Sequence, residues 1–196
     1  MRTAYAIIWT IVWPFFSLFP PCRCIGREHI PEGGALFCAN HTRLSDPVCL
    51  VMAVGRKHQM RVMAKAEFMR APILGFLLKK AGVFAVERGK SDVGAIKTAI
   101  KFLKSGENVL LFPEGTRVRD GEEGEAKTGA AMLAVRTGVP IVPVYIPARK
   151  PWFRFTDVVI GEPYYPQVEG RKGTAEEYKA IAEDLMERIY ALGKAA

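Results

Sequence analysis

The sequence predicts an α/β fold: a single layered domain with a mostly parallel sheet flanked by helices, plus an N-terminal hydrophobic membrane-anchoring segment. Short apolar runs typical of buried strands alternate with segments of helical periodicity. A length of 196 residues suits one domain. Hydrophobic residues make up 49% of the chain and charged residues 24%, so the chain can bury a core and is not disordered throughout.

The predicted strands are short apolar runs at residues 35–39, 61–64, 83–86, 108–112, 141–146 and 157–160. Helices are expected at 46–54, 72–80, about 96–103 and 130–137. Asp46 and Pro47 would open the first helix, as its cap and its first helical residue. Gly106 and Gly138 would close the third and the fourth. A last helix begins at the capping box Thr174-Ala-Glu-Glu177.

The N-terminal segment carries no charge between Arg2 and Arg23. Its length just meets the roughly 20 apolar residues that a membrane-spanning helix needs, but Pro14 interrupts it and Pro20-Pro21 ends it. Trp and Phe rings prefer the headgroup level, so an anchor lying in the membrane surface fits best. A spanning helix, a cleaved signal peptide and a buried helix remain alternatives. We expect residues 1–24 to form the anchor and 25–196 the folded domain.

The net charge of +8 indicates polyanionic partners: nucleic acid, an anionic membrane face or phosphorylated substrates. Residues 56–90 hold nine Lys or Arg and two acidic residues. Within this region, residues 68–80 mix apolar bulk with cations, which is typical of a helix lying on an anionic lipid surface. An ordinary core helix with a solvated face is the alternative.

The four cysteines are Cys22, Cys24, Cys38 and Cys49. They show no zinc-ligand spacing and suggest no disulfide framework. We therefore expect free thiols in a reducing compartment.

The motif Asn40-His-Thr-Arg-Leu-Ser-Asp46 directly follows a predicted strand. His41 and Asp46 would point about 140° apart on a continuous helix, so we place His41 on the loop and Asp46 at the helix entrance. There the carboxylate can bond one imidazole nitrogen and leave the other as a base for an alcohol proton. A plain helix cap and an ordinary loop histidine are the structural alternatives.

Two further motifs end in arginines just after predicted strands, one at Arg88 and the other, Phe112-Pro-Glu-Gly-Thr-Arg117, at Arg117. Ligands gather at the carboxyl ends of strands in such sheets, and a guanidinium matches the geometry of a phosphate. Gly115 allows close approach of the backbone, and Glu114 would orient Arg117 or contact a substrate hydroxyl. A solvated strand end or a salt bridge is the alternative.

Four motifs in order resemble the glycerolipid acyltransferase family, most closely the bacterial 1-acyl-sn-glycerol-3-phosphate acyltransferases. They are Asn-His-x4-Asp, Gly-Val-Phe-x-Val-x-Arg, Phe-Pro-Glu-Gly-Thr-Arg and Val139-Pro-Ile-Val-Pro-Val-Tyr145. Lys127-Thr-Gly129 resembles the Lys-x-Gly that follows the third motif. The likeness covers roughly residues 25–147. Val118 departs from it, since many members carry Ser there.

The resemblance implies transfer of a fatty acyl group from acyl-CoA or acyl-carrier protein to lysophosphatidic acid, which makes phosphatidic acid in phospholipid biosynthesis. His41 would be the general base on the free hydroxyl, and Asp46 would orient it. No metal or other cofactor is expected. Backbone N–H groups near the first motif would stabilise the oxyanion.

The resemblance also assigns substrate-binding roles. Arg117 and Arg88 would bind the phosphate, Glu114 and Gly115 would shape the pocket, and Lys65 resembles a family lysine near the phosphate. The partners would be the acyl donor, lysophosphatidic acid and an anionic membrane surface, with no nucleic acid. The enzyme would act at the cytoplasmic face of the cell membrane.

Three alternatives remain open. One is an acyltransferase that uses another lyso-lipid, such as a lyso-amino lipid. Another is a His/Asp-assisted acyl hydrolase, although none of the four serines, Ser45 beside Asp46 included, lies in Gly-x-Ser-x-Gly. The third is a non-enzymatic binder of anionic lipid or nucleic acid, although no aromatic stacking motif or zinc module supports it.

Overall fold

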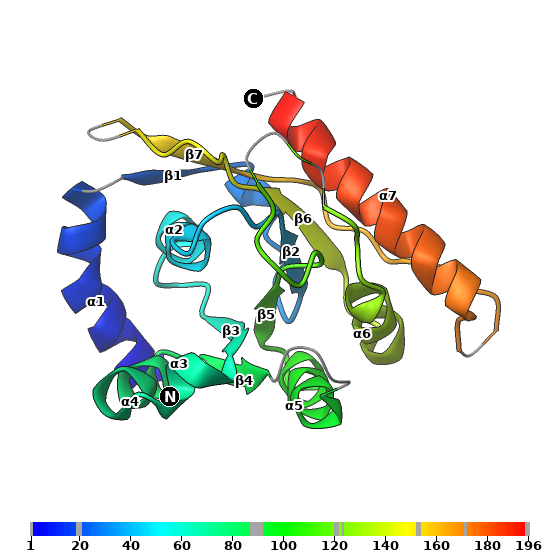
Figure 1. Ribbon diagram of the computed structural model, residues 1–196, viewed down its shortest axis with the longest axis horizontal. Coiled ribbons are helices and arrows are strands. Elements are labelled where there is room, and N and C mark those ends of the chain that lie inside the picture. Colours follow the sequence, from blue (N-terminus) through cyan, green and yellow to red (C-terminus); the bar gives the residue numbers. More distant parts are fainter. Residues whose placement is uncertain are drawn as a thin grey trace.

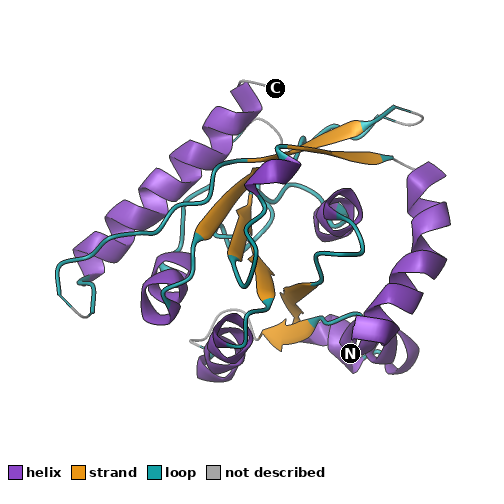
Figure 2. Cartoon of the chain, turned by 180° about the vertical axis from the view of Figure 1, so that it is seen from behind, coloured by secondary structure: helices purple, strands orange, loops and turns teal. Residues whose placement is uncertain are grey.

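The computed structural model describes residues 2–18, 21–86, 92–119, 122, 124–151, 154–170 and 172–194. Its strands form one sheet in the order β1-β7-β6-β2-β5-β3-β4, with helices on both faces (Figures 1 and 2). The strands are β1 (Cys22–Ile25), β2 (Leu36–Ala39), β3 (Met60–Lys65), β4 (Phe84–Val86), β5 (Asn108–Leu111), β6 (Ile141–Tyr145) and β7 (Thr156–Ile160). Neighbouring strands are parallel except β6 and β7, so the predicted mostly parallel sheet is confirmed.

The sheet divides the hydrophobic core into two layers, each covered by helices. They are α1 (Arg2–Leu18), α2 (Asp46–Val54), α3 (Ala66–Arg70), α4 (Pro72–Lys80), α5 (Val93–Lys104), α6 (Gly129–Thr137) and α7 (Ala175–Lys194), with a 3-10 turn η1 (Arg27–His29). Apolar residues of α2 pack on one face of the sheet, and those of α5, α6 and α7 pack on the other. α1 lies outside α2 and reaches α4 (Figure 1).

Most expected elements lie where the sequence places them, and the capping box of α7 is confirmed. The Thr174 hydroxyl accepts the Glu177 N–H at 3.2 Å, and the Glu177 carboxylate accepts the Thr174 N–H at 2.7 Å. α5 begins at Val93, earlier than expected, because the Asp92 carboxylate accepts the Ala95 N–H at 2.9 Å and so caps an extra turn. Sequence reasoning missed β1 and α3, which have four and five residues.

The N-terminal segment forms the helix α1, which continues through Pro14. Among the described residues, no helix is both long enough and apolar enough to cross a membrane. The sheet already includes residues 22–24, which the sequence assigns to the anchor.

The expectation of four free thiols is wrong for Cys22 and Cys49, which form a disulfide between β1 and α2 with their Cα atoms 5.7 Å apart. Cys24 and Cys38 are free. The spacing of the cysteines in the sequence does not predict this disulfide, because Cys22 and Cys49 come together only when β1 folds beside α2. The inference of a reducing compartment loses the support that it drew from free thiols.

Candidate active site

The carboxyl ends of three adjacent strands form the centre of the site. β2 lies between β6 and β5, and all three run in the same direction. The segments that leave these strands therefore emerge at one edge of the sheet. His41 follows β2, Glu114 follows β5 and Lys150 follows β6.

The structure confirms the predicted hydrogen bond between the imidazole and the carboxylate of the first motif. His41 Nδ1 lies 3.0 Å from Asp46 Oδ2, with His41 on the loop and Asp46 at the first residue of α2. The Asp46 side chain is completely buried, and that of His41 is 7% exposed. Such a pair is fixed in orientation and shielded from bulk water.

Asp46 does not cap α2 as predicted, because its carboxylate bonds backward to the loop. Oδ2 also accepts the N–H groups of Thr42 at 2.8 Å and Arg43 at 2.7 Å, and Oδ1 accepts Lys150 Nζ at 2.6 Å. Burial raises the pKa of Asp46, but the hydrogen bonds from His41, Lys150 and the backbone outweigh it and leave this pKa below its ordinary value. Asp46 is therefore an anion at neutral pH.

Because Asp46 is ionised, the proton shared with His41 must lie on Nδ1, and Nε2 is left unprotonated in the neutral ring. The Phe112 ring stacks on the imidazole at a centroid distance of 4.1 Å and an interplanar angle of 23°. One hydrogen bond and one stacked ring thus fix both the tautomer and the plane of His41.

Glu114 supports the backbone of the histidine loop. Its Oε2 accepts the His41 N–H at 2.8 Å, and its Oε1 accepts the Tyr190 hydroxyl of α7 at 2.9 Å. Burial outweighs these bonds and raises the pKa of Glu114. Among the described residues, the Glu114 carboxylate bonds His41 and Tyr190 and makes no hydrogen bond or ion pair with Arg117.

Three backbone N–H groups of the first motif, where oxyanion donors are expected, are already occupied. The N–H groups of Thr42 and Arg43 donate to Asp46, and that of His41 donates to Glu114. An oxyanion would need other donors in this arrangement.

The remaining expected site residues that the structure describes lie around this centre. The Val118 N–H donates to His41 O at 2.8 Å, which attaches the exposed Arg117 next to the histidine loop. Gly115 has a φ of +70°, and a Cβ there would lie 2.9 Å from Cε and Nζ of Lys127, so the turn favours glycine. Lys65, at the end of β3, pairs with Glu67 at 2.6 Å. Arg88 lies outside the described residues.

Sequence reasoning missed the residues that tie the loop after β2 to the segment after β6. The Asn40 amide donates to Ile146 O at 2.9 Å and accepts the Ile146 N–H at 2.7 Å. Arg43 Nε donates to Ala148 O at 2.7 Å. Asn40 could have been found, since it belongs to the first motif, but no local signal marks Lys150 or Tyr190.

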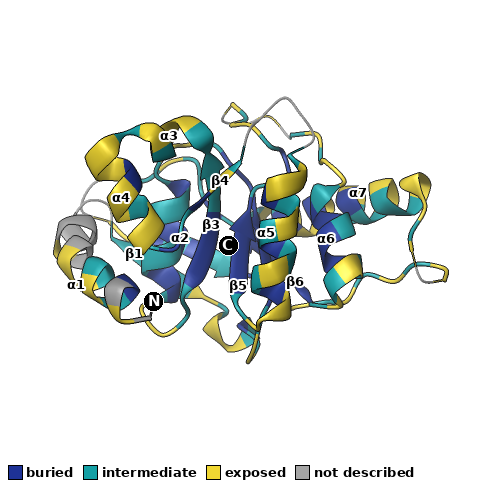
Figure 3. Cartoon of the chain, turned by 90° about the horizontal axis from the view of Figure 1, so that it is seen from below, coloured by how far each residue is buried: buried dark blue, intermediate teal, exposed yellow. Residues whose placement is uncertain are grey.

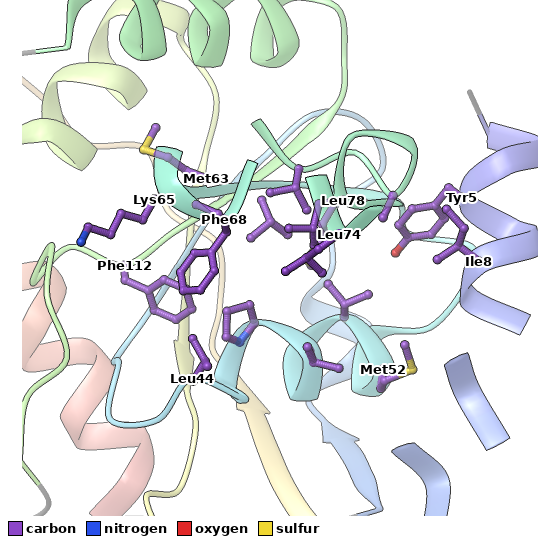
Figure 4. A pocket seen from close by; sticks show the side chains of 18 of the residues that line it. Tyr5, Ile8, Leu44, Met52, Met63, Lys65, Phe68, Leu74, Leu78 and Phe112 are labelled. Atoms are coloured by element: carbon purple, nitrogen blue, oxygen red, sulfur yellow. The ribbon is translucent and has the colours of Figure 1, made fainter. Parts of the chain in front are cut away.

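An apolar pocket of about 390 Å³ opens beside His41 (Figure 4). Its wall combines His41, Phe112 and Lys65 with apolar side chains of α1, α2, β3, α3 and α4. In Figure 4, Lys65 and Phe112 lie at one end of the pocket, and Tyr5 and Ile8 of α1 lie at the other. The shape and lining suit a hydrocarbon chain whose polar end lies near the imidazole.

Known proteins resemble this chain in sequence and in fold. A family model described as Acyltransferase matches residues 21–147. The 1-acyl-sn-glycerol-3-phosphate acyltransferase of Bacillus subtilis is 31% identical over 179 residues, 88% of this chain and 88% of that protein. A chloroplastic 1-acyl-sn-glycerol-3-phosphate acyltransferase, LPAT1, of Arabidopsis thaliana is 31% identical over 139 residues, 68% of this chain and 38% of that protein. The chain thus spans about two fifths of the length of such chloroplastic relatives.

Two further matches bear on substrate and fold. A lyso-ornithine lipid O-acyltransferase of Pseudomonas aeruginosa is 33% identical over 122 residues, 61% of this chain and 45% of that protein. The crystal structure of the 1-acyl-sn-glycerophosphate (LPA) acyltransferase, PlsC, from Thermotoga maritima is 26% identical and has a TM-score of 0.69 over 100% of this chain and 80% of that chain. Because the family model covers well over half of the residues, the chain belongs to the acyltransferase family.

Proposed function

We propose that the protein is a 1-acyl-sn-glycerol-3-phosphate O-acyltransferase, which moves a fatty acyl group from a thioester donor to the free hydroxyl of lysophosphatidic acid. The observation that carries this proposal is the buried His41–Asp46 pair, whose imidazole lies in the wall of an apolar pocket. The names of the relatives from Bacillus subtilis and Arabidopsis thaliana support the acceptor.

In this proposal His41 Nε2 is the general base. It takes the proton of the acceptor hydroxyl as that oxygen attacks the thioester carbonyl, while the Asp46 carboxylate stabilises the imidazolium through the Nδ1–H bond. When the tetrahedral intermediate collapses, the carbon–sulfur bond breaks and the Nε2 proton passes to the leaving sulfur. The new ester and a free thiol are the products, and the thiol belongs to coenzyme A or acyl-carrier protein.

Cations around the rim would hold the acceptor phosphate. Arg117 is exposed and lies beside the loop that carries His41, because the N–H of the adjacent Val118 bonds His41 O. The Lys127 side chain lies against Gly115, which precedes Arg117 by two residues. Lys65 lines the pocket together with His41. Arg88 follows β4, the neighbour of β3, and keeps its proposed role in phosphate binding. Glu114 would shape the site by fixing the His41 backbone.

An anionic membrane surface is the proposed location of the reaction. α4 buries only Gly75 and is largely exposed (Figure 3). Its Ile73 and Phe76 are 78% and 60% exposed. Lys79 and Lys80 end the same helix, and Lys80 Nζ lies 5.6 Å from the centroid of the Phe76 ring. Apolar side chains bordered by cations suit a bilayer with anionic headgroups. α1, which contacts α4, would lie in the same surface.

The proposal is tested with the purified full chain in mixed micelles, given acyl-CoA or acyl-carrier-protein thioesters and a panel of lyso-lipids. We expect phosphatidic acid from lysophosphatidic acid, and a loss of nearly all turnover in His41→Ala with an unchanged circular dichroism spectrum. Turnover that survives His41→Ala would overturn the proposal.

A different lyso-lipid acceptor is the second candidate, favoured by the lyso-ornithine lipid O-acyltransferase of Pseudomonas aeruginosa. A preference for lyso-ornithine lipid over lysophosphatidic acid in the same panel would select it. An acyl hydrolase would release fatty acid without any acceptor and would depend on Ser45 rather than His41.

A further inference from the structure

Lys150 is a buried cation in contact with the His41–Asp46 pair. Its side chain is 5% exposed, and its Nζ donates to Asp46 Oδ1 at 2.6 Å and to Pro147 O at 3.0 Å. The first bond is to a carboxylate that is itself completely buried. Burying an ammonium or a carboxylate costs free energy unless it is paired, so Lys150 and Asp46 stabilise each other through the carboxylate oxygen that does not bond His41.

Both oxygens of the Asp46 carboxylate have hydrogen-bond partners. Oδ2 faces the imidazole and the two loop amides, and Oδ1 faces Lys150. Without the Oδ1 contact the carboxylate could rotate about its Cβ–Cγ bond and misdirect the Nδ1–H bond. The ammonium also offsets the negative charge beside the imidazole.

Other charged groups near the pair come from several elements. Glu114, after β5, bonds the His41 N–H and takes a second bond from Tyr190 of α7. Lys65, after β3, lines the pocket with His41 but pairs with Glu67. Arg43 directs its guanidinium to Ala148 O rather than to the carboxylate. Among the described residues, Lys150 is the one Lys or Arg whose side chain contacts Asp46.

We propose that Lys150 is a positioning residue of the acyl transfer: it acts through Asp46, fixes the carboxylate against His41 and offsets part of the negative charge that the imidazole faces. This inference rests on the proposed role of His41 as general base. It adds a residue from the segment after β6, which lies 104 positions from Asp46, to the pair that the first motif supplies.

The test is the pH dependence of kcat/KM. Lys150→Met removes a cation and leaves Asp46 to favour the imidazolium, so the acid limb of the profile should move up by about one pH unit. Turnover at pH 7 should fall about tenfold and recover in part at higher pH. Lys150→Arg keeps the charge and should keep the limb at its wild-type position. Arg149→Met, an equal loss of charge at the exposed neighbouring residue, should leave both the limb and kcat unchanged.

A residue that only anchors the segment would lower kcat equally at every pH, and an unshifted limb in Lys150→Met would therefore overturn the proposal. If Lys150→Met does not fold, as judged by circular dichroism, Lys150→Gln replaces it: a limb that shifts in Lys150→Gln but not in Lys150→Arg supports the proposal, and one that shifts in neither overturns it.

The Asp46→Asn background tests whether Lys150 acts through Asp46. There the added Lys150→Met change should lower the residual turnover less than twofold, and a further tenfold loss would contradict the inference. Failure of the proposed function itself has a different signature, because wild-type turnover would be absent or would survive His41→Ala.

Discussion

Asp46 concentrates three separate duties on one buried carboxylate: it orients the imidazole, it holds the loop through two amides, and it neutralises Lys150. Its pKa lies below the ordinary value in the folded protein, so its ionised form stabilises the fold. That contribution is present above the unfolded pKa of about 3.9 and is lost as the pH falls through the lower folded value. Glu114 affects stability in the opposite direction, because its pKa is raised. Its contribution to the stability of the fold is present at low pH and is lost as the pH rises through the folded pKa.

Asp46→Asn should lower the free energy of unfolding at pH 7 by about 3–5 kcal/mol, because it leaves Lys150 buried without its counterion. The difference in unfolding free energy from wild type should begin to narrow when the pH is lowered from 5 to 3, because Asp46 in the unfolded wild-type chain takes up a proton there while the folded form stays ionised. Urea unfolding of both proteins at pH 7, 5 and 3 measures this difference in the free energy of unfolding. Asp157→Asn, which breaks an exposed pair with Arg23, is the control and should change little at any pH. A difference in the free energy of unfolding that stays the same at all three pH values would contradict the assignment of Asp46 as an ionised group in the folded protein.

Tyr190 links the last helix to the loop that carries His41 through a single carboxylate, that of Glu114. Its hydroxyl donates to Glu114, which in turn holds the His41 N–H, and it accepts the Gly124 N–H at 3.0 Å. Tyr190→Phe should lower the free energy of unfolding by about 1–3 kcal/mol, because a buried carboxylate loses a donor. It should also lower kcat several-fold with little change in KM. Tyr178→Phe, on the first turn of the same helix, should do neither. Equal effects in the two variants would show that the link to Glu114 is irrelevant.

At the scale of elements, sequence patterns locate strands and helices that are long or strongly periodic. They fail for β1, whose four residues include a charged Arg23 and alternate in burial, and for α3, which has five residues. Both owe their structure to neighbours: β1 pairs with β7, and α3 packs on α4. The pattern in residues 68–80 left open whether the helix is buried in the core or lies on a membrane, and the exposure of α4 favours the membrane.

The proposed membrane contact of α4 can be tested without disturbing the core. Ile73→Ser combined with Phe76→Ser should lower the fraction bound to vesicles that contain anionic phospholipid several-fold, because two exposed apolar side chains no longer enter the bilayer. Turnover of a soluble short-chain substrate should stay near wild type. Val93→Ser on α5, which also changes an exposed apolar side chain, is the control. Undiminished binding of the double variant, measured by co-sedimentation, would exclude α4 as a contact.

At the scale of the molecule, the candidate site divides into a part that the sequence predicts and a part that only the sheet order reveals. His41 and Asp46 are five positions apart, so spacing and chemistry suffice to pair them. Lys150 and Tyr190 lie 104 and 76 positions from their carboxylate partners. Their placement follows from β6-β2-β5 adjacency and from the packing of α7, which no local pattern encodes.

The Cys22–Cys49 disulfide is another contact that spans the fold, and it ties the N-terminal part of the chain to α2. α1 closes one end of the pocket and is followed by β1, which carries Cys22, while Cys49 lies on α2 three residues after Asp46. A cross-link over a sequence separation of 27 restricts the unfolded chain by roughly 3–4 kcal/mol in the entropic account.

Reduction with dithiothreitol should therefore lower the free energy of unfolding of the wild type by about 2–4 kcal/mol. The Cys22→Ala, Cys49→Ala double variant should start at the lower stability and show no response to the reductant, whereas Cys24→Ala should respond as the wild type does, because Cys24 is a free thiol. Urea unfolding with and without reductant measures each. A wild type that is indifferent to the reductant, with Cys22 and Cys49 both alkylated before unfolding, would show that the bond does not form in solution and that packing alone holds β1 against α2.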